Sequence, residues 1–382
     1  MKKYDVIICG CGPAGATAGA TLARQGYSVA MLDRATFPRK KLCGGLLTWK
    51  AVKLLETAYG ETVESLTDAG VINHASDYYS IRTFAKTLAE GELSYPFHFV
   101  DRTIFDAHLL DHARKAGANI FEGAKIVSCD AENGIVTLEN GDQFIGQYVI
   151  GSDGANSVVR RSFPHYDRAK FKKFMAPALE ISLPISAFPN PVKYPELIIG
   201  FLDAGYGWVF PNQDRVILGI CGLNHKKINF SNQFREYLDF LEIDSDIIPE
   251  FHGHPLPYGN YLEDPVQGRV LLAGDAGGYV EPLFGEGIFF ALCSGYYVGE
   301  AIAEAFAKKT HPGPIYTSRM HRQIIPEIKA SDRLRWMLFR AMRYAGPFSI
   351  GMFVNSAATP LAEMVHGIRS YSWLRKKHWD FI

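Results

Sequence analysis

The feature that most constrains this chain is a glycine-rich turn directly after a short apolar run near its N-terminus. Residues 6–9 are apolar, and Gly10, Gly12 and Gly15 follow in G-x-G-x-x-G spacing. The first glycine allows a tight turn, the second lets backbone approach a pyrophosphate, and the third lets the next helix pack against the strand. The pattern predicts a buried strand, a turn, and a helix that begins near Pro13 and attracts phosphates to its N-terminus.

An acidic residue after the next apolar run extends this pattern. Residues 28–32 predict a second strand, and Asp33 follows it. An acid about 20 positions after the glycines is where a ribose hydroxyl is expected to be bound. The alternative is that the glycines only permit tight packing. The order strand, turn, helix, strand, acid favours dinucleotide binding, with the three glycines and Asp33 as cofactor contacts.

Charge and cysteine content narrow the class of protein further. The 382 residues include 40 Lys plus Arg and 40 Asp plus Glu, so nothing predicts a nucleic-acid partner. The six cysteines lack metal-site spacing, so no metal is expected. No apolar run reaches the length of about 18 residues that marks a transmembrane helix. Because the N-terminus also lacks a signal core, we expect a cytoplasmic protein.

Strand and helix patterns alternate along the chain, which predicts interwoven lobes. Helical spacing covers residues 105–116 and 287–308, and short strands with hairpin turns cover residues 120–150. Residues 171–225 are rich in strand patterns, and residues 316–382 are mostly helical. We expect a mixed α/β (α+β) fold with three parts. A Rossmann-type cofactor lobe takes residues 1–58, 100–165 and 268–310, an antiparallel-sheet substrate lobe takes 59–99 and 166–267, and a helical C-terminal region takes 311–382.

Three later segments narrow the dinucleotide to FAD by resemblance. Together with the glycine turn, residues 102–106, 149–157 and 271–277 resemble the FAD-containing aromatic-hydroxylase superfamily. The resemblance implies that Asp275 hydrogen-bonds the ribityl chain, that Arg102 lies near the nucleotide portion, and that Asp153 supports the pyrophosphate region. It also implies cofactor contacts from Ala14 and Ala124.

Each of the three polar residues has a plainer alternative. Asp275 ends a predicted strand, residues 270–275, and should point into the crevice at the carboxyl end of the sheet; the alternative is a helix N-cap. Arg102 can instead form an ordinary salt bridge near a helix start, and Asp153 can serve only in a turn.

The segment 282–288 precedes a predicted helix and carries the next cofactor expectation. In the superfamily, the equivalent turn presents backbone N–H groups to the flavin pyrimidine, which implies contacts from Gly287 and Ile288. A helix N-terminus at this place stabilises the negative charge of the reduced flavin. Glu286 in the same segment is a candidate catalytic acid, with a capping or structural role as the preferred interpretation.

Two further segments point to the reaction. Residues 40–46 contain Cys43, Gly44 and Gly45, and residues 205–211 contain a Tyr-x-Trp-x-Phe-Pro pattern. The combination resembles the geranylgeranyl reductase family over about residues 1–300. The resemblance implies FAD-dependent saturation of carbon–carbon double bonds in isoprenoid chains, acting on archaeal lipid tails, the chlorophyll side-chain precursor or prenylated quinones. Leu42 and Leu46 stand where many members have another glycine or a proline, which leaves the substrate open.

The chemistry of alkene reduction fits these residue types. An isolated alkene needs a proton at one carbon as hydride reaches the other, so the site should be dry and apolar. Alternate residues of a strand share a face, so Tyr206, Trp208 and Phe210 are predicted to form one wall of the substrate site; the alternative is a core face.

Cys43 is a candidate proton donor or a redox partner of Cys293, and the alternative is a thiol that only packs. Gly44 and Gly45 are expected to contact flavin through their backbone atoms.

The electron donor and the partners stay open. No second glycine fingerprint is present, and the superfamily implies transient binding of NAD(P)H or electron transfer from ferredoxin. Rival functions are a monooxygenase or halogenase, and a flavoprotein that carries electrons to quinone. The expected substrate is an isoprenoid lipid or a prenyl diphosphate.

In the C-terminal region, arginines 333, 335, 340 and 343 alternate with apolar residues, and residues 373–379 repeat this mixture of basic and aromatic side chains. Such segments can rest on an anionic membrane, or pack on the core with a solvated basic face.

Overall fold

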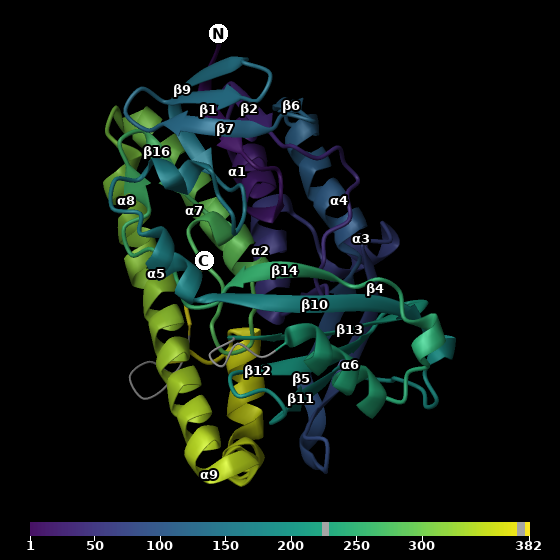
Figure 1. The fold of residues 1–382 in the computed structure, drawn as a ribbon. Helices are drawn as coiled ribbons and strands as arrows, with labels where there is room; N and C mark the ends of the chain where they lie inside the picture. Colours follow the sequence, from purple (N-terminus) through teal and green to yellow (C-terminus); the bar gives the residue numbers. More distant parts are fainter. Residues whose placement is uncertain (224–228, 373–378) are drawn as a thin grey trace.

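Two eight-stranded sheets organise the molecule, and helices cover both (Figure 1). The computed structural model describes residues 1–223, 229–372 and 379–382. The described chain begins in the first sheet, enters the second sheet twice and returns to the first each time, and ends in helices that lie along both. The predicted mixed α/β class, with two interleaved lobes and a helical C-terminal region, is confirmed. The residue boundaries of the three parts stay a prediction.

The first sheet is mainly parallel and has the glycine turn at its centre. Its strands run in the order β15 (Val266–Gln267), β16 (Val270–Leu272), β9 (Gln143–Gly151), β1 (Lys2–Cys9), β2 (Val29–Leu32) and β6 (Asn119–Phe121). β7 (Ile126–Asp130) and β8 (Ile135–Leu138) extend it as antiparallel strands from β9. The apolar ends of β1 and β2 are buried because helices and β8 cover their two faces.

Helices pack against this sheet from segments that are far apart in the sequence. α1 (Pro13–Arg24) and α7 (Ile288–Lys308) lie side by side and share one hydrophobic core with α2 (Trp49–Tyr59) and α4 (Arg102–Lys115). Small residues make the close approach possible: a Cβ at Gly295 would lie 2.3 Å from the Ala14 carbonyl oxygen. α8 (Pro312–Arg319) follows α7 and contacts it.

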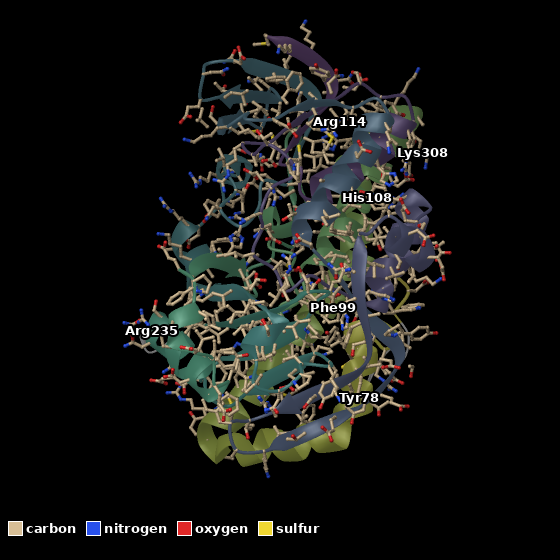
Figure 2. All side chains as sticks on the ribbon, turned by 90° about the vertical axis from the view of Figure 1, so that its right-hand side faces the viewer. Tyr78, Phe99, His108, Arg114, Arg235 and Lys308 are labelled. Carbon is tan, nitrogen blue, oxygen red and sulfur yellow. The ribbon has the colours of Figure 1, made fainter. Side chains whose placement is uncertain are left out.

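The second sheet is mostly antiparallel and forms the lower part of Figure 1. Its strands run in the order β14 (His252–Pro257), β10 (Met175–Pro184), β13 (Arg215–Gly222), β12 (Gly205–Pro211), β11 (Glu196–Ile199), β4 (Ile72–Arg82), β5 (Thr87–Val100) and β3 (Leu46–Leu47). Within the stretch predicted to be strand-rich, residues 171–225, β12 and β13 pair as an antiparallel hairpin. In Figure 2, Tyr78 marks the long β4–β5 hairpin, and Phe99 lies where β5 approaches the helices of the first lobe.

α6 (Phe230–Phe240) and α9 (Ile325–His366) cover the second sheet. Phe234, Tyr237 and Leu238 of α6 pack into the sheet core. Figure 1 shows α9 running down one side of the molecule and turning back, so that its last turns lie beside the sheet. A π-helical segment, Met320–Ile324, joins α8 to α9. The remaining short helices are α3 (Val63–Asp68) and α5 (Arg168–Lys173).

Three differences from the sequence expectations stand out. The strand predicted at residues 270–275 ends at Leu272, and Gly274–Ala276 form a 3-10 turn. The last of the short strands predicted over residues 120–150 is long: β9 runs from Gln143 to Gly151. Strands β4, β5 and β14 had no predicted counterpart. Among the described helices, none combines the length and apolar character needed to cross a membrane.

Candidate active site

The glycine turn has the shape that a pyrophosphate requires. Gly10 has φ +97°, and a Cβ at Gly15 would lie 1.9 Å from the Gly10 carbonyl oxygen, so neither position accepts a side chain. Gly12 has more room than the other two glycines, because the nearest atom to its Cβ position is Arg39 Nη2 at 3.5 Å. Gly12 caps α1 without a side-chain hydrogen bond. The first N–H groups of α1 therefore face a site that fits the phosphates of FAD.

Asp33 lies against the same turn, as the sequence predicts for a ribose-binding acid. Its Oδ2 accepts a hydrogen bond from the Cys11 N–H at 2.8 Å, and its Oδ1 accepts one from the Ala35 N–H at 2.8 Å. The buried Ala124 donates its N–H to the Asp33 carbonyl at 2.7 Å. Both residues thus lie at the edge of the predicted nucleotide site. Ala14, also buried, lies within α1 beside Gly274.

Asp275 has the environment expected of a ligand-binding carboxylate. It lies in the 3-10 turn after β16, and its Oδ1 is 3.8 Å from the Cβ position of Gly287, the N-cap of α7. Burial raises the pKa of its carboxyl, and among the described residues no donor hydrogen-bonds to it. A partly buried carboxylate without a protein donor among the described residues fits the ribityl hydroxyls of FAD.

Arg160 fixes the backbone of this turn. Its guanidinium donates to the carbonyls of Ala155 and Ala276, both at 2.7 Å.

For Asp153 and Arg102 the structure shows the plainer contacts. Asp153 accepts hydrogen bonds from the Ser157 hydroxyl at 2.5 Å and the Val158 N–H at 2.6 Å, so its side chain stabilises the turn that contains it. Arg102 makes a two-pronged ion pair with Asp106, at 2.6 and 2.8 Å. Arg39 contacts the same carboxylate at 3.1 Å. Cofactor contacts of Asp153 and Arg102 stay predictions.

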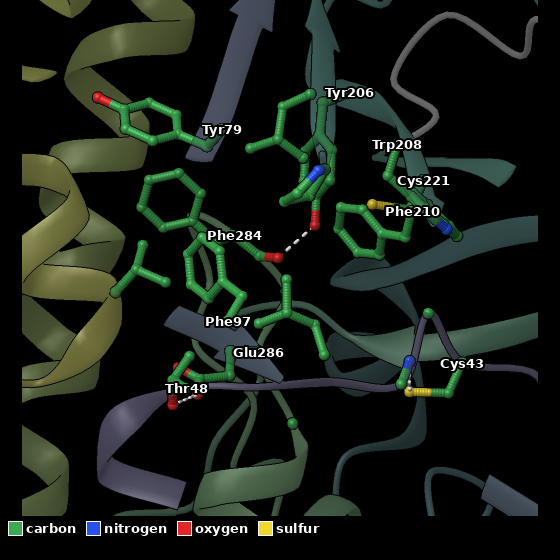
Figure 3. Close-up of a pocket in the computed structure, with 18 of the residues that line it drawn as sticks. Cys43, Thr48, Tyr79, Phe97, Tyr206, Trp208, Phe210, Cys221, Phe284 and Glu286 are labelled. Atoms are coloured by element: carbon green, nitrogen blue, oxygen red, sulfur yellow. Dashed lines mark hydrogen bonds between the residues drawn. The ribbon is translucent and has the colours of Figure 1, made fainter. Parts of the chain in front are cut away.

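A cavity of about 210 Å³ opens between the first-lobe loops and the second sheet (Figure 3). It extends from the loop at residues 42–46 and the start of α7 to the cavity face of the second sheet and the last turns of α9. Its wall is mostly apolar and aromatic. The aromatic lining residues are Tyr79, Phe97, Tyr206, Trp208, Phe210 and Phe284. Such a cavity suits a long hydrocarbon chain.

The three residues predicted to share a face of one strand do so. Tyr206, Trp208 and Phe210 of β12 all line the cavity, rather than a closed core. The Tyr206 hydroxyl donates to the Phe284 carbonyl, which joins the wall to the loop before α7 (Figure 3). The Trp208 Nε1–H is buried and has no hydrogen-bond partner. Contact with a substrate stays a prediction.

The Cys-Gly-Gly loop reaches the cavity beside this wall. Cys43 lines the cavity, and its Sγ accepts the Gly45 N–H at 3.5 Å. A Cβ at Gly44 would lie 2.6 Å from the Phe210 ring, and one at Gly45 would lie 2.1 Å from the Val100 carbonyl oxygen. The two glycines therefore allow the loop to pass between the aromatic wall and β5. Their contact with the cofactor stays a prediction.

Cys293 does not reach this loop. Both Cys43 and Cys293 are free thiols. Cys293 is fully buried within α7, away from the lining of the cavity, and burial raises its pKa to about 12. The redox pair considered from the sequence is therefore not formed in this structure.

Glu286 has the structural contacts that the sequence analysis preferred. Its Oε1 accepts the Thr48 hydroxyl at 2.7 Å, and its Oε2 lies 2.5 Å from Lys50 Nζ (Figure 3). Lys50 is fully buried and also donates to the Val365 carbonyl at 2.6 Å. This ion pair links α2, the loop before α7 and α9. Sequence reasoning missed Thr48 and Lys50, because more than two hundred residues separate them from Glu286.

Two further polar residues in the cavity were also missed. Glu180 of β10 and His254 of β14 both line it. A single acid within the apolar run 174–183 was a signal that could have identified Glu180, because a charged residue on a buried strand face needs a reason. Burial lowers the pKa of His254 to about 4, and the nearby Lys41 and Arg102 act in the same direction.

A cluster outside the cavity has the residue types of a metal site. Glu61 Oε1 lies 3.1 Å from His108 Nε2 and 2.9 Å from His112 Nε2. Figure 2 shows His108 on the outer part of the first lobe. Arg24, which can only donate, contacts His112 Nδ1 at 3.2 Å, so Nε2 of His112 carries the proton. The contacts describe a satisfied hydrogen-bond cluster.

Comparison with known proteins gives three findings that agree with this geometry. Residues 3–221 match the family described as FAD binding domain. The geranylgeranyl diphosphate reductase of Rhodobacter capsulatus is 30% identical over 327 residues, which cover 83% of this chain and 79% of that protein. The digeranylgeranylglycerophospholipid reductase of Methanocella arvoryzae is 28% identical over 317 residues, covering 79% and 78%.

A solved structure shares the fold. The geranylgeranyl bacteriochlorophyll reductase-like protein from Thermoplasma acidophilum aligns with a TM-score of 0.72 at 21% identity, covering 96% of this chain and 92% of that one. At 21% identity, this similarity shows only that the two proteins share a fold.

Proposed function

Since the chain belongs to the geranylgeranyl reductase family of FAD-binding oxidoreductases, we propose that it saturates carbon–carbon double bonds of an isoprenoid lipid or prenyl diphosphate. The observation that carries the proposal is the aromatic cavity, which begins at the start of α7 and the Cys-Gly-Gly loop. When bound and reduced, FAD supplies the hydride.

Different residues of the chain would bind FAD and the substrate. Gly10, Gly12, Gly15 and Asp33 would hold the nucleotide half of FAD, and Asp275 would hold the ribityl chain. The N–H groups of Gly287 and Ile288, at the start of α7, would face the pyrimidine. Tyr206, Trp208 and Phe210 would orient the hydrocarbon and exclude water.

The thiol of Cys43, at the cavity wall, is a candidate proton donor. Its replacement by alanine tests that role: a donor thiol predicts a loss of alkene saturation with unchanged FAD binding.

The test of the function is anaerobic turnover with product analysis. The holoenzyme, reduced with dithionite, is incubated with geranylgeranyl diphosphate and separately with a geranylgeranyl glycerolipid. The expected result is a product heavier by two hydrogens for each double bond reduced. Addition of oxygen atoms under air, with no hydrogen gain without air, would favour the monooxygenase. Rapid quinone reduction without saturation would favour the electron carrier.

The electron donor is proposed as NAD(P)H or a ferredoxin. Anaerobic mixing of the oxidised holoenzyme with NADPH, NADH or reduced ferredoxin distinguishes them by the rate at which the flavin absorbance bleaches. A donor that reduces the flavin within the turnover time is the physiological class, and a rate far slower than turnover excludes it.

The C-terminal region is proposed as a peripheral contact with an anionic membrane, where an isoprenoid substrate resides. The sequence had grouped Arg335 with this surface, but Arg335 is buried and donates to the Tyr258 carbonyl at 2.8 Å. The exposed basic and apolar residues of this region recur at helical spacing on one face of α9. Residues 373–378, which the sequence also assigns to this surface, lie outside the described residues. The exposed set is Arg333, Trp336, Met337, Arg340, Arg343 and Tyr344.

A further inference from the structure

The cavity contains two carboxyl groups, Glu180 and Glu286, in different environments. We propose that Glu180 is the acid that delivers the proton to the alkene, a role that rests on the proposed function.

Glu180 lies in a row of paired residues that crosses the four neighbouring strands β14, β10, β13 and β12. In the register, it lies opposite Gly219 of β13 and His252 of β14, and Gly219 lies opposite Trp208 of β12. Gly219 has no side chain, and the indole of Trp208 covers it: a Cβ at Gly219 would lie 2.3 Å from Trp208 Cζ2. The glycine therefore lets the indole reach toward Glu180 on the cavity face.

Glu180 also touches the loop that carries the family resemblance. The Cys43 N–H donates to Glu180 Oε1 at 2.7 Å, across 137 residues of sequence. The side chain is 8% exposed, and its neighbour on the same strand face, Ala178, lines the cavity with it. Glu180 thus places a polar group between the Cys-Gly-Gly loop and the aromatic wall, where the reacting end of a substrate would lie.

The surroundings of Glu180 raise the pKa of its carboxyl, so that a substantial fraction of it is protonated at neutral pH. Burial raises the pKa of its carboxyl to about 7, against the lowering effects of the Cys43 N–H, Lys41, Arg102 and the Trp208 indole. No lysine or arginine forms an ion pair with it among the described residues. His254, on the adjacent strand β14, is neutral because burial lowers its pKa to about 4.

Glu286 has the opposite environment. Its carboxyl lies 2.5 Å from Lys50 Nζ and accepts a hydrogen bond from the Thr48 hydroxyl at 2.7 Å, so an ion pair and a hydrogen bond hold it in place. Two carboxyls in different surroundings are a common basis for assigning the acid in an active site. The contacts of Glu286 join structural elements, whereas Glu180 forms no ion pair among the described residues and faces the cavity beside the Cys-Gly-Gly loop.

The proposed step balances as follows. The O–H bond of Glu180 breaks, and the π electrons of the alkene form a C–H bond with that proton at one carbon. FAD, when bound and reduced, would supply the hydride and its electron pair for the second C–H bond at the other carbon. The product has gained two hydrogens, and Glu180 is left as a carboxylate that regains its proton from water.

The kinetic test compares Glu180→Gln, Glu180→Asp and Cys43→Ala with the wild-type holoenzyme in anaerobic single turnovers. The rate of saturation in the wild type should fall as pH rises above about 7, because the acid must be protonated. Glu180→Gln should lower the rate by about 100-fold or more and remove this pH dependence. Glu180→Asp should restore part of the rate. Cys43→Ala should keep the pH profile, and loss of the profile in this variant would assign the proton to the thiol instead of Glu180.

Glu92→Gln is the matched control, because Glu92 is an exposed residue on β5 of the same sheet. The infrared spectrum of the wild type minus that of Glu180→Gln should show a protonated carboxyl that titrates near pH 7. The subtraction is needed because burial also raises the pKa of Glu281 to about 7.

The acid role would be overturned if Glu180→Gln kept the wild-type rate and pH profile. It would also be overturned if Glu180 were ionised well below pH 7. Neither result would contradict alkene saturation itself. A wild type that saturates no isoprenoid would instead overturn the proposed function, and the acid role with it.

Discussion

At the scale of single residues, buried polar groups without protein partners point most directly to bound ligands. The Asp275 carboxylate has no donor among the described residues, and the Trp208 Nε1–H has no acceptor. Buried polar groups in folded proteins are nearly always hydrogen-bonded, so the partly buried Asp275 carboxylate indicates a ligand atom, whereas the Trp208 indole lies toward Glu180. The sequence predicted both residues as contacts, because each lies at a fixed place in a short motif.

Asp275→Asn should weaken FAD binding with little effect on the fold. A hydrogen bond to a charged group contributes about 1.5–3 kcal/mol, so the affinity of the apoprotein for FAD should fall by roughly 10- to 150-fold. Titration of the apoprotein with FAD, followed by flavin fluorescence, measures it. Asp264→Asn is the control, since that side chain is 86% exposed. Equal affinities in the two variants would exclude Asp275 as a cofactor ligand.

At the scale of helices and strands, local patterns were predictable and long-range contacts were not. The strand–turn–helix unit of β1 and α1 follows from apolar runs and glycine spacing within a few residues. The β4–β5 hairpin was missed, although Leu93, Tyr95, Phe97 and Phe99 alternate as strand residues do. The Glu180 contact with Cys43 depends on how β10 meets a loop 137 residues away, which no local pattern contains.

Lys50→Met should destabilise the protein, because Lys50 joins α2 to Glu286 and to the end of α9. Removing one partner of a buried ion pair costs about 3–5 kcal/mol. Urea unfolding followed by circular dichroism measures the change. Lys53→Met is the control: its pair with Glu56 is exposed, and such pairs contribute about 0–1 kcal/mol. A loss below 1 kcal/mol for Lys50→Met would show that this ion pair does not hold the three elements together.

The exposed face of α9 predicts membrane binding that depends on apolar contact as well as charge. Trp336 and Met337 are 60% and 63% exposed, and Trp336→Ala combined with Met337→Ala should weaken binding to phosphatidylglycerol vesicles by more than about tenfold. Co-sedimentation measures it. Ile247→Ala is the control, because Ile247 is also an exposed apolar residue, at 43%, but lies outside α9. Unchanged sedimentation of the double variant would favour a helix with a merely solvated basic face.

At the scale of the whole molecule, the active site belongs to neither lobe alone. The first sheet and α1 provide the phosphate site, the second sheet provides the aromatic wall, and α9 closes part of the cavity. The fold class was predictable because each lobe has its own periodicity and motifs. The shape of the cavity was not, because it depends on how Phe97, Phe284 and Leu361 from three distant segments meet.

The central claim is that the cavity presents an isoprenoid double bond to reduced FAD. The most direct measurement is an anaerobic single turnover in which flavin absorbance and product mass are followed together. The account predicts that geranylgeranyl diphosphate or a geranylgeranyl lipid reoxidises the flavin in the absence of oxygen, with one double bond saturated for each flavin reoxidised. Flavin that stays reduced until oxygen is admitted, with the isoprenoid unchanged in mass, would contradict it.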